Sequence, residues 1–145
     1  MKIRLLLLAV LALAAPVARG EDWPTDYGQA LSTAKESKKC VLINFTGSDW
    51  CGPCIVMHKL VFSKPAFAEY AGKNLVLLSA DFPMRKAIPD KLREQNDQLM
   101  HQYHVEQYPT VILLSPDGKV LGQLTGYSGE GPAEIIAWVE KLRPK

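Results

Sequence analysis

The chain has 145 residues, of which 48% are hydrophobic, enough for one compact domain with its own core. Its 17 basic and 15 acidic residues give a net charge of +2, and the longest basic run is the pair Lys38–Lys39. Nucleic-acid and anionic-membrane surfaces need clustered Lys and Arg, so the composition argues against both kinds of partner.

Residues 1–20 have the pattern of a signal peptide, because two basic residues precede the apolar run 5–15 and small residues follow it up to Gly20. The run is shorter than the roughly 20 residues that a membrane-spanning helix needs, although an uncleaved anchor stays open as an alternative. Cleavage after Gly20 would remove three of the 17 basic residues and none of the 15 acidic ones, leaving residues 21–145 with a net charge of −1. We therefore expect an exported protein, and the bacterial periplasm is the compartment that best fits such a signal.

The first half of the remaining chain alternates helical and strand patterns. Apolar residues at helical spacing predict an amphipathic helix over 25–37. The continuous apolar runs 40–45 and 75–82 have strand length, which predicts two strands buried on both faces. Between them, the loop 46–49 leads into a helix that begins at a cysteine pair. Ser-Lys-Pro at 63–65 should interrupt that helix and restart it, since Ser can cap a helix and Pro is tolerated in a first turn.

The second half begins with a long polar segment, in which spaced apolar residues predict a helix over 89–103. Two strands should follow at 110–115 and 119–126, joined by a Pro-Asp-Gly turn and therefore antiparallel. Pro132 then opens a final helix. Strands that alternate with helices predict an α/β domain, to whose sheet the terminal hairpin adds an antiparallel edge.

Cys51 and Cys54 are separated by two residues, a spacing that several kinds of site share. A zinc site needs about four ligands, and only His58 lies close enough in sequence to assist, so we expect no metal. A c-type haem needs a histidine directly after the second cysteine, where Ile55 stands. A permanent disulfide would persist in an exported protein, but it would close a very small loop and stabilise the fold little. A redox pair is the interpretation that we favour.

The redox interpretation has a physical basis. Cys51 falls at the predicted beginning of a helix, where free N–H groups and the macrodipole favour an anion. Lowering the pKa of a thiol from about 8.5 to about 7 takes about 2 kcal/mol, much of which a helix terminus can supply. The Cys51 thiolate could then attack a substrate disulfide, and Cys54 could resolve the mixed disulfide. Gly52 and Pro53 keep the turn between them tight.

Four features of the sequence together resemble the thioredoxin family. They are the motif WCGPC at 50–54, the preceding VLINF, the tripeptide YPT at 108–110, and Gly126 near the end of the last predicted strand. The resemblance covers about residues 25–143. It implies a thioredoxin fold, with a central mixed sheet flanked by helices and an extended helical connection before a cis-proline. Within the family, it points to exported or periplasmic thiol–disulfide oxidoreductases.

The resemblance also implies roles for individual residues. Tyr108–Pro109 is expected to be a cis bond beside the cysteines, where it exposes backbone that pairs with the substrate chain. Trp50, next to the attacking sulfur, and Gly52 and Pro53, between the cysteines, complete the expected substrate-binding surface.

The sequence departs from the family pattern at three places. Asn44 stands where thioredoxins carry a buried Asp that helps to move the proton of the second cysteine, and Leu77 stands where a lysine is usual. Proton transfer to Cys54 could then depend on water or on Asp49, although a solvated Asp49 is an alternative. The segment 83–98 makes the connection longer than usual, and it either shapes the choice of partner or forms an elongated solvated helix.

The third cysteine, Cys40, begins the first predicted strand. We expect it to act as a small buried hydrophobic residue. A regulatory thiol or an intermolecular disulfide is the alternative.

The function expected from the sequence is reduction of disulfides in other envelope proteins by the Cys51–Cys54 couple. A membrane-bound donor would supply the electrons, no cofactor is needed, and the protein is expected to be a monomer. A disulfide oxidase or isomerase, or a non-catalytic binding module of the same fold, are the alternatives.

Overall fold

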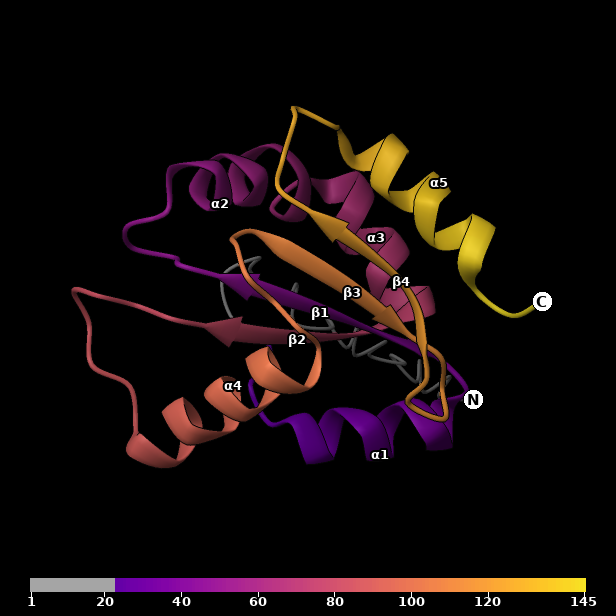
Figure 1. Cartoon of the computed structure of the whole chain (residues 1–145). Coiled ribbons are helices and arrows are strands. Elements are labelled where there is room, and N and C mark those ends of the chain that lie inside the picture. The colour runs from indigo at the N-terminus through magenta and orange to yellow at the C-terminus, as the bar shows by residue number, and fades with distance from the viewer. Residues whose placement is uncertain (1–22) are drawn as a thin grey trace, which may run out of the picture.

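A four-stranded mixed sheet lies at the centre of the computed structural model, which describes residues 23–145 (Figure 1). The predicted signal peptide, residues 1–20, lies outside the described residues. The elements in chain order are α1 (Tyr27–Ser37), β1 (Cys40–Thr46), α2 (Gly52–Met57), the π-helix η1 (His58–Phe62), α3 (Pro65–Asn74), β2 (Leu75–Asp81), α4 (Asp90–Gln102), β3 (Thr110–Leu114), β4 (Val120–Thr125) and α5 (Pro132–Leu142). This is the predicted order. Within residues 23–145, no helix has the length and apolar character that crossing a membrane requires.

The strands follow the order β2-β1-β3-β4, with β1 parallel to β2 and the other neighbours antiparallel. Every residue of the inner strands β1 and β3 is buried, which confirms the burial predicted for the strand at 40–45. The prediction that the strand at 75–82 is buried on both faces is wrong, because β2 lies at an edge and only three of its seven residues are buried. At this edge the Ser79 N–H donates a hydrogen bond of 2.9 Å to the Pro24 carbonyl.

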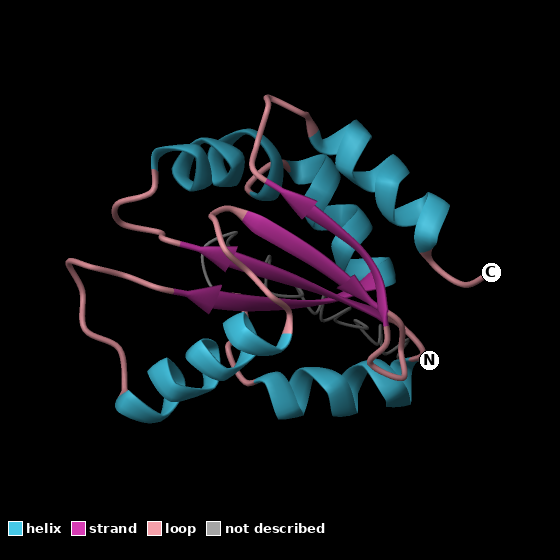
Figure 2. Ribbon diagram, viewed as in Figure 1, coloured by secondary structure: helices cyan, strands magenta, loops and turns pink. Residues whose placement is uncertain are grey.

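Helices cover both faces of the sheet (Figure 2). Successive side chains of a strand point to opposite faces, so β1 contributes to two cores. Its residues Val41, Ile43 and Phe45 pack with α1 and α4. Leu42 points the other way and packs with α2, η1, α3 and α5. The predicted flanking helices are thereby confirmed on each side of the sheet.

The break in the second helical region falls at the predicted place, but its chemistry differs from the prediction. Pro65 lies in the first turn of α3, as expected, whereas the cap is Lys64 and makes no side-chain hydrogen bond. The Ser63 hydroxyl instead donates to the carbonyls of His58 and Lys59, at 2.9 and 3.0 Å. Ser63 therefore closes η1 and does not open α3.

Polar residues replace apolar ones where β1 and β2 approach their C-terminal ends. The parallel register pairs Asn44 with Ser79 and Thr46 with Asp81. Paired residues lie on the same face, and Asn44 follows Leu42 by two positions, so all four lie on the α2 side of the sheet. The sheet therefore presents a polar floor beneath the helix that carries the cysteines.

Candidate active site

Cys51 and Cys54 are joined in a disulfide at the beginning of α2, with their Cα atoms 5.3 Å apart. Cys51 is the N-cap residue, and its sulfur accepts a hydrogen bond of 3.3 Å from the Cys54 N–H. Pro53 lies in the first turn, where a missing N–H costs nothing, and both Gly52 and Pro53 are exposed. Both cysteines are buried, whereas the turn between them is exposed.

The aromatic residue before the cysteines is fixed from two sides. The Trp50 indole N–H donates to the Phe82 carbonyl at 2.7 Å, and its ring meets the Tyr108 ring edge to face at a centroid distance of 5.9 Å. Phe82 also packs on Tyr108, at 5.2 Å. Despite these contacts, 40% of Trp50 is exposed, which leaves an apolar surface beside Cys51.

The Tyr108–Pro109 bond is cis, as the family resemblance implies. Pro109 precedes β3, and its carbonyl accepts a hydrogen bond of 2.8 Å from the Gly126 N–H at the end of β4. The Tyr108 hydroxyl donates to the Met100 sulfur of α4 at 3.3 Å. The structure thus brings Tyr108, which precedes the cis-proline, into contact with Trp50, the residue next to Cys51.

Asp49 anchors the long connection after β2. Its carboxylate accepts hydrogen bonds of 2.8 to 3.0 Å from the backbone N–H groups of Met84, Arg85 and Lys86. These bonds, that of Met84 first, lower the pKa of Asp49 below its usual value. The carboxylate therefore stays charged and fixes the segment 84–86 beside Trp50, and its predicted role in proton transfer stays a prediction.

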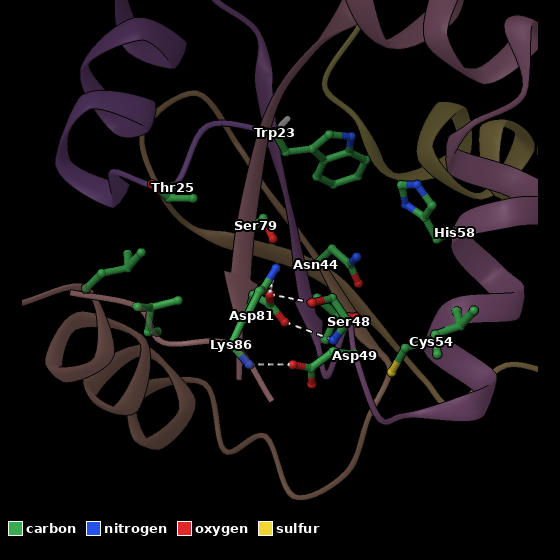
Figure 3. A pocket seen from close by; sticks show the side chains of 14 residues that line it. Trp23, Thr25, Asn44, Ser48, Asp49, Cys54, His58, Ser79, Asp81 and Lys86 are labelled. Carbon is green, nitrogen blue, oxygen red and sulfur yellow. Dashed lines mark hydrogen bonds and ion pairs between the residues drawn. The ribbon is translucent and has the colours of Figure 1, made fainter. Parts of the chain in front are cut away.

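A cavity of about 580 Å³ lies on the other side of the disulfide, above the polar floor of the sheet (Figure 3). Cys54 lines it, whereas Cys51 does not. Asn44 lies in this floor, and its buried Oδ1 atom has no hydrogen-bond partner among the described residues. The other polar residues that line the cavity are Thr46, Ser48, Asp49, His58, Ser79, Asp81 and Lys86, with Thr25 at its rim.

Sequence reasoning did not identify Asp81 as part of this region. Its carboxylate accepts hydrogen bonds from both the backbone N–H and the hydroxyl of Ser48, at 2.9 and 2.6 Å, and forms an ion pair of 3.1 Å with Lys86. Asp81 joins this region because the register of β1 against β2 places it next to Thr46. That register cannot be read from two apolar runs, so the sequence held no signal for Asp81.

Cys40 is buried at the opposite end of β1 from the disulfide, and it is free. Burial raises the pKa of its thiol. It packs with the apolar residues of the α2 side, as expected of a small hydrophobic residue.

The geometry separates the two sulfurs by environment. Cys51 lies at a helix N-terminus, where N–H groups and the helix dipole stabilise a thiolate. Cys54 lies one turn inside, against a polar cavity. This arrangement can support attack by Cys51 and resolution by Cys54.

Comparison with known proteins agrees with this geometry. The family model described as "Thioredoxin-like domain" matches residues 27–143. Disulfide bond reductase DsbH of Chlamydia pneumoniae is 32% identical over 131 residues, which cover 88% of this chain and 78% of DsbH. Thioredoxin-related protein DsbJ of the same organism is 30% identical over 87% of this chain, but the match spans only 37% of DsbJ.

The same fold is present in solved structures. The DsbH oxidoreductase superimposes with a TM-score of 0.78 and 30% identity, covering 91% of both chains. A thioredoxin from Thermus thermophilus gives a TM-score of 0.62 at 21% identity, over 82% of this chain and 85% of the other, and so supports the fold alone. These matches confirm the thioredoxin fold expected from the sequence.

Proposed function

The chain belongs to the thioredoxin-like family and is a thiol–disulfide oxidoreductase, and from this premise we propose that it reduces disulfide bonds in other exported proteins. One observation carries the proposed direction: the similarity to a protein named disulfide bond reductase extends over 88% of this chain and 78% of that protein. The Gly-Pro pair between Cys51 and Cys54 adds support, because it resembles the reducing members of the family.

The reaction consists of two thiol–disulfide exchanges. The Cys51 thiolate attacks one substrate sulfur, which forms a mixed disulfide and releases the other sulfur as a thiolate that takes up a proton. Cys54 then loses its proton and attacks the Cys51 sulfur, so the second substrate thiolate leaves and is protonated in turn. The substrate gains two electrons and two protons, and the protein ends in the Cys51–Cys54 disulfide form that the structure contains.

The substrate binds, in this proposal, on the exposed side of the disulfide. Trp50 supplies apolar contact area, and the turn at Gly52 and Pro53 leaves room for an extended chain. The backbone at Tyr108 and Pro109 is the family's platform for pairing with that chain. The partners are therefore disulfide-containing proteins that present a locally unfolded segment.

The proposed compartment is the bacterial periplasm, reached by means of the predicted signal peptide at 1–20. Each turnover leaves the pair oxidised, and an oxidising compartment does not return it to the dithiol. We therefore infer that a membrane-bound donor outside this chain supplies electrons to a monomeric protein.

The resting redox state of the pair in cells tests the direction. Cells producing the chain with Cys40→Ser would be quenched in acid and treated with an alkylating agent that adds mass to free thiols. A reductase with a working donor should carry two free thiols in most molecules. A population that is mostly disulfide would favour the oxidase, and full biological activity in the Cys51→Ser, Cys54→Ser double variant would favour the binding module.

A further inference from the structure

Resolution of the mixed disulfide requires that Cys54 lose a proton inside the protein. The Cys54 side chain is only 4% exposed, and a neutral thiol is a poor nucleophile compared with its thiolate. Beneath it, the strand carries Asn44, whose amide cannot accept a proton at neutral pH. Another group must therefore take this proton, or solvent must.

Both carboxylates that line the cavity are already engaged. Asp81 accepts two hydrogen bonds from Ser48 and pairs with Lys86. Asp49 accepts three backbone N–H bonds that lower its pKa. A carboxylate stabilised in its charged form is a weaker base, so neither group is well suited to remove a proton from a thiol.

His58 and Lys86 are the other titratable side chains that line the cavity with Cys54, and the Lys86 ammonium is paired with Asp81. His58 lies four residues after Cys54 on the same helical face, and its backbone N–H donates to the Cys54 carbonyl. Its half-buried imidazole makes no hydrogen bond with another described residue. In Figure 3 the His58 imidazole is turned toward the Trp23 ring, the Cys54 sulfur projects from the same helix lower in the view, and the Asn44 amide points toward that helix at a height between them. A neutral imidazole has a free ring nitrogen that can accept a proton, which makes histidine a common general base.

We propose that His58 is the proton acceptor for Cys54, acting through water in the cavity beneath the disulfide. The inference rests on the proposed function, because it concerns the second exchange of that reaction. The Cys54 proton passes to the imidazole and makes an imidazolium, while the thiolate forms the Cys51–Cys54 bond and expels the substrate thiolate. The imidazolium returns its proton to solvent or to the departing thiolate.

Asn44 has a positioning role in this proposal. The cavity of about 580 Å³ is lined by polar groups and by the apolar residues Trp23, Ile55, Ile88 and Leu92. It has room for several water molecules at its polar part, each of which needs two to four polar partners. The unpartnered Oδ1 of Asn44 is such a partner, since a buried acceptor without a hydrogen bond is costly. A water held by Asn44 would lie between the sulfur and the imidazole.

Stopped-flow reaction of the reduced full chain with 5,5′-dithiobis(2-nitrobenzoate) tests the proposal. Attack by Cys51 releases the first coloured thiolate and resolution by Cys54 releases the second, so one trace reports both steps. Rates would be measured from pH 5.5 to 9 with Cys40→Ser as the common background. In His58→Gln we expect the first phase to be unchanged, and the second to slow by about 10- to 100-fold at pH 7. The pH dependence of the second phase should move to higher pH, because, without the imidazole, hydroxide or bulk water must remove the proton.

Two further variants control this measurement. His101→Gln removes an exposed histidine of α4, outside the cavity, and should leave both phases unchanged. Asn44→Asp in the His58→Gln background places a carboxylate beside Cys54 and should restore most of the second-phase rate. A second phase in His58→Gln within twofold of the parent at every pH would overturn the proposal, as would equal slowing of both phases. Absence of the first phase in the parent would instead contradict the thiol-exchange function itself.

Discussion

The two sides of the disulfide differ in nearly every physical property. On the Cys51 side lies the partly exposed, apolar Trp50, at 40% exposure. On the Cys54 side, polar side chains of β1 and β2 enclose a cavity. The comparison teaches that two chemically identical thiols, one helical turn apart, receive different tasks from their surroundings. In the proposed mechanism, Cys51 attacks the substrate and Cys54 passes its proton to groups in the cavity.

The largest expected effects come from removing each sulfur separately. Cys51→Ser should abolish disulfide reduction, because no thiol at the exposed turn remains to begin the reaction. In the Cys54→Ser variant, Cys51 should still attack the substrate. The mixed disulfide between Cys51 and the substrate should then accumulate, because no second thiol remains to resolve it. Mass spectrometry of each variant after mixing with a peptide disulfide distinguishes the two results. A stable mixed disulfide on Cys54 in the Cys51→Ser variant would contradict the assigned order of attack.

The second prediction perturbs only the exposed side. A Cβ atom at Gly47 would lie 2.6 Å from the Trp50 Nε1 atom, and that ring is held by Phe82 and Tyr108. Gly47→Ala should therefore displace Trp50 and lower kcat/KM for a protein disulfide by about tenfold, equivalent to about 1.4 kcal/mol. The loss should be smaller for a low-molecular-weight disulfide, which needs less docking surface.

Gly72→Ala is the matched control, because a Cβ atom at this position in α3 meets no atom within 4 Å. It should leave both rates unchanged and raise stability slightly, as Gly-to-Ala changes do inside exposed helices. If Gly47→Ala behaved like Gly72→Ala in both assays, the docking role of Trp50 would be wrong.

The third prediction concerns the Asp49 anchor between the two sides. Asp49→Asn loses one acceptor oxygen and the charge, so the backbone N–H groups of Met84, Arg85 and Lys86 should exchange with deuterium faster. Because the folded-state pKa of Asp49 is lowered, its stabilisation is present above the ordinary value of about 3.9 and is lost as the pH falls through the folded-state pKa. Protection of 84–86, compared with Asp49→Asn, should therefore disappear only in that acidic range. If residues 84–86 were equally protected from exchange in the parent and in Asp49→Asn at pH 7, the anchoring role of Asp49 would be wrong.

The smallest effect on activity is expected from Cys40→Ser, because Cys40 lies at the opposite end of β1 from the disulfide. Cys40→Ser places a hydroxyl in the core and should lower the free energy of unfolding by about 1 to 3 kcal/mol, as measured by urea denaturation. The rate of disulfide reduction should not change. In the native parent protein, burial and the raised thiol pKa should make Cys40 slow to react with iodoacetamide. A marked change in reduction rate would revive the regulatory interpretation.

Much of the fold could be predicted because apolar runs and prolines mark the element ends. The strand expected at 40–45 runs from Cys40 to Thr46, and Pro132 begins α5 as predicted. The burial of β2 could not be predicted, since an apolar run does not reveal whether a strand has one neighbour or two. The role of Ser63 was missed for a similar reason: a local pattern fits either a cap or the closure of the preceding helix.

The candidate site also has a part that could be predicted from the sequence and a part that could not. The cysteine pair and Tyr108–Pro109 belong to short motifs, so the family resemblance implied the disulfide and the cis bond that the structure contains. The polar cavity depends on the register of β1 against β2 and on Lys86 from the long connection, which no short motif encodes. Only the structure shows that His58, considered in the sequence for zinc, lines the same cavity as Cys54.

The redox potential of the Cys51–Cys54 pair tests the central claim most directly. The Cys40→Ser protein would be equilibrated in dithiothreitol or glutathione buffers of known potential, and the fraction of dithiol would be read by alkylation and mass. A reductase of this family should give a potential near −270 mV. A potential between about −180 and −120 mV would contradict the reducing direction, and a pair that never exchanged across the range would contradict the redox function.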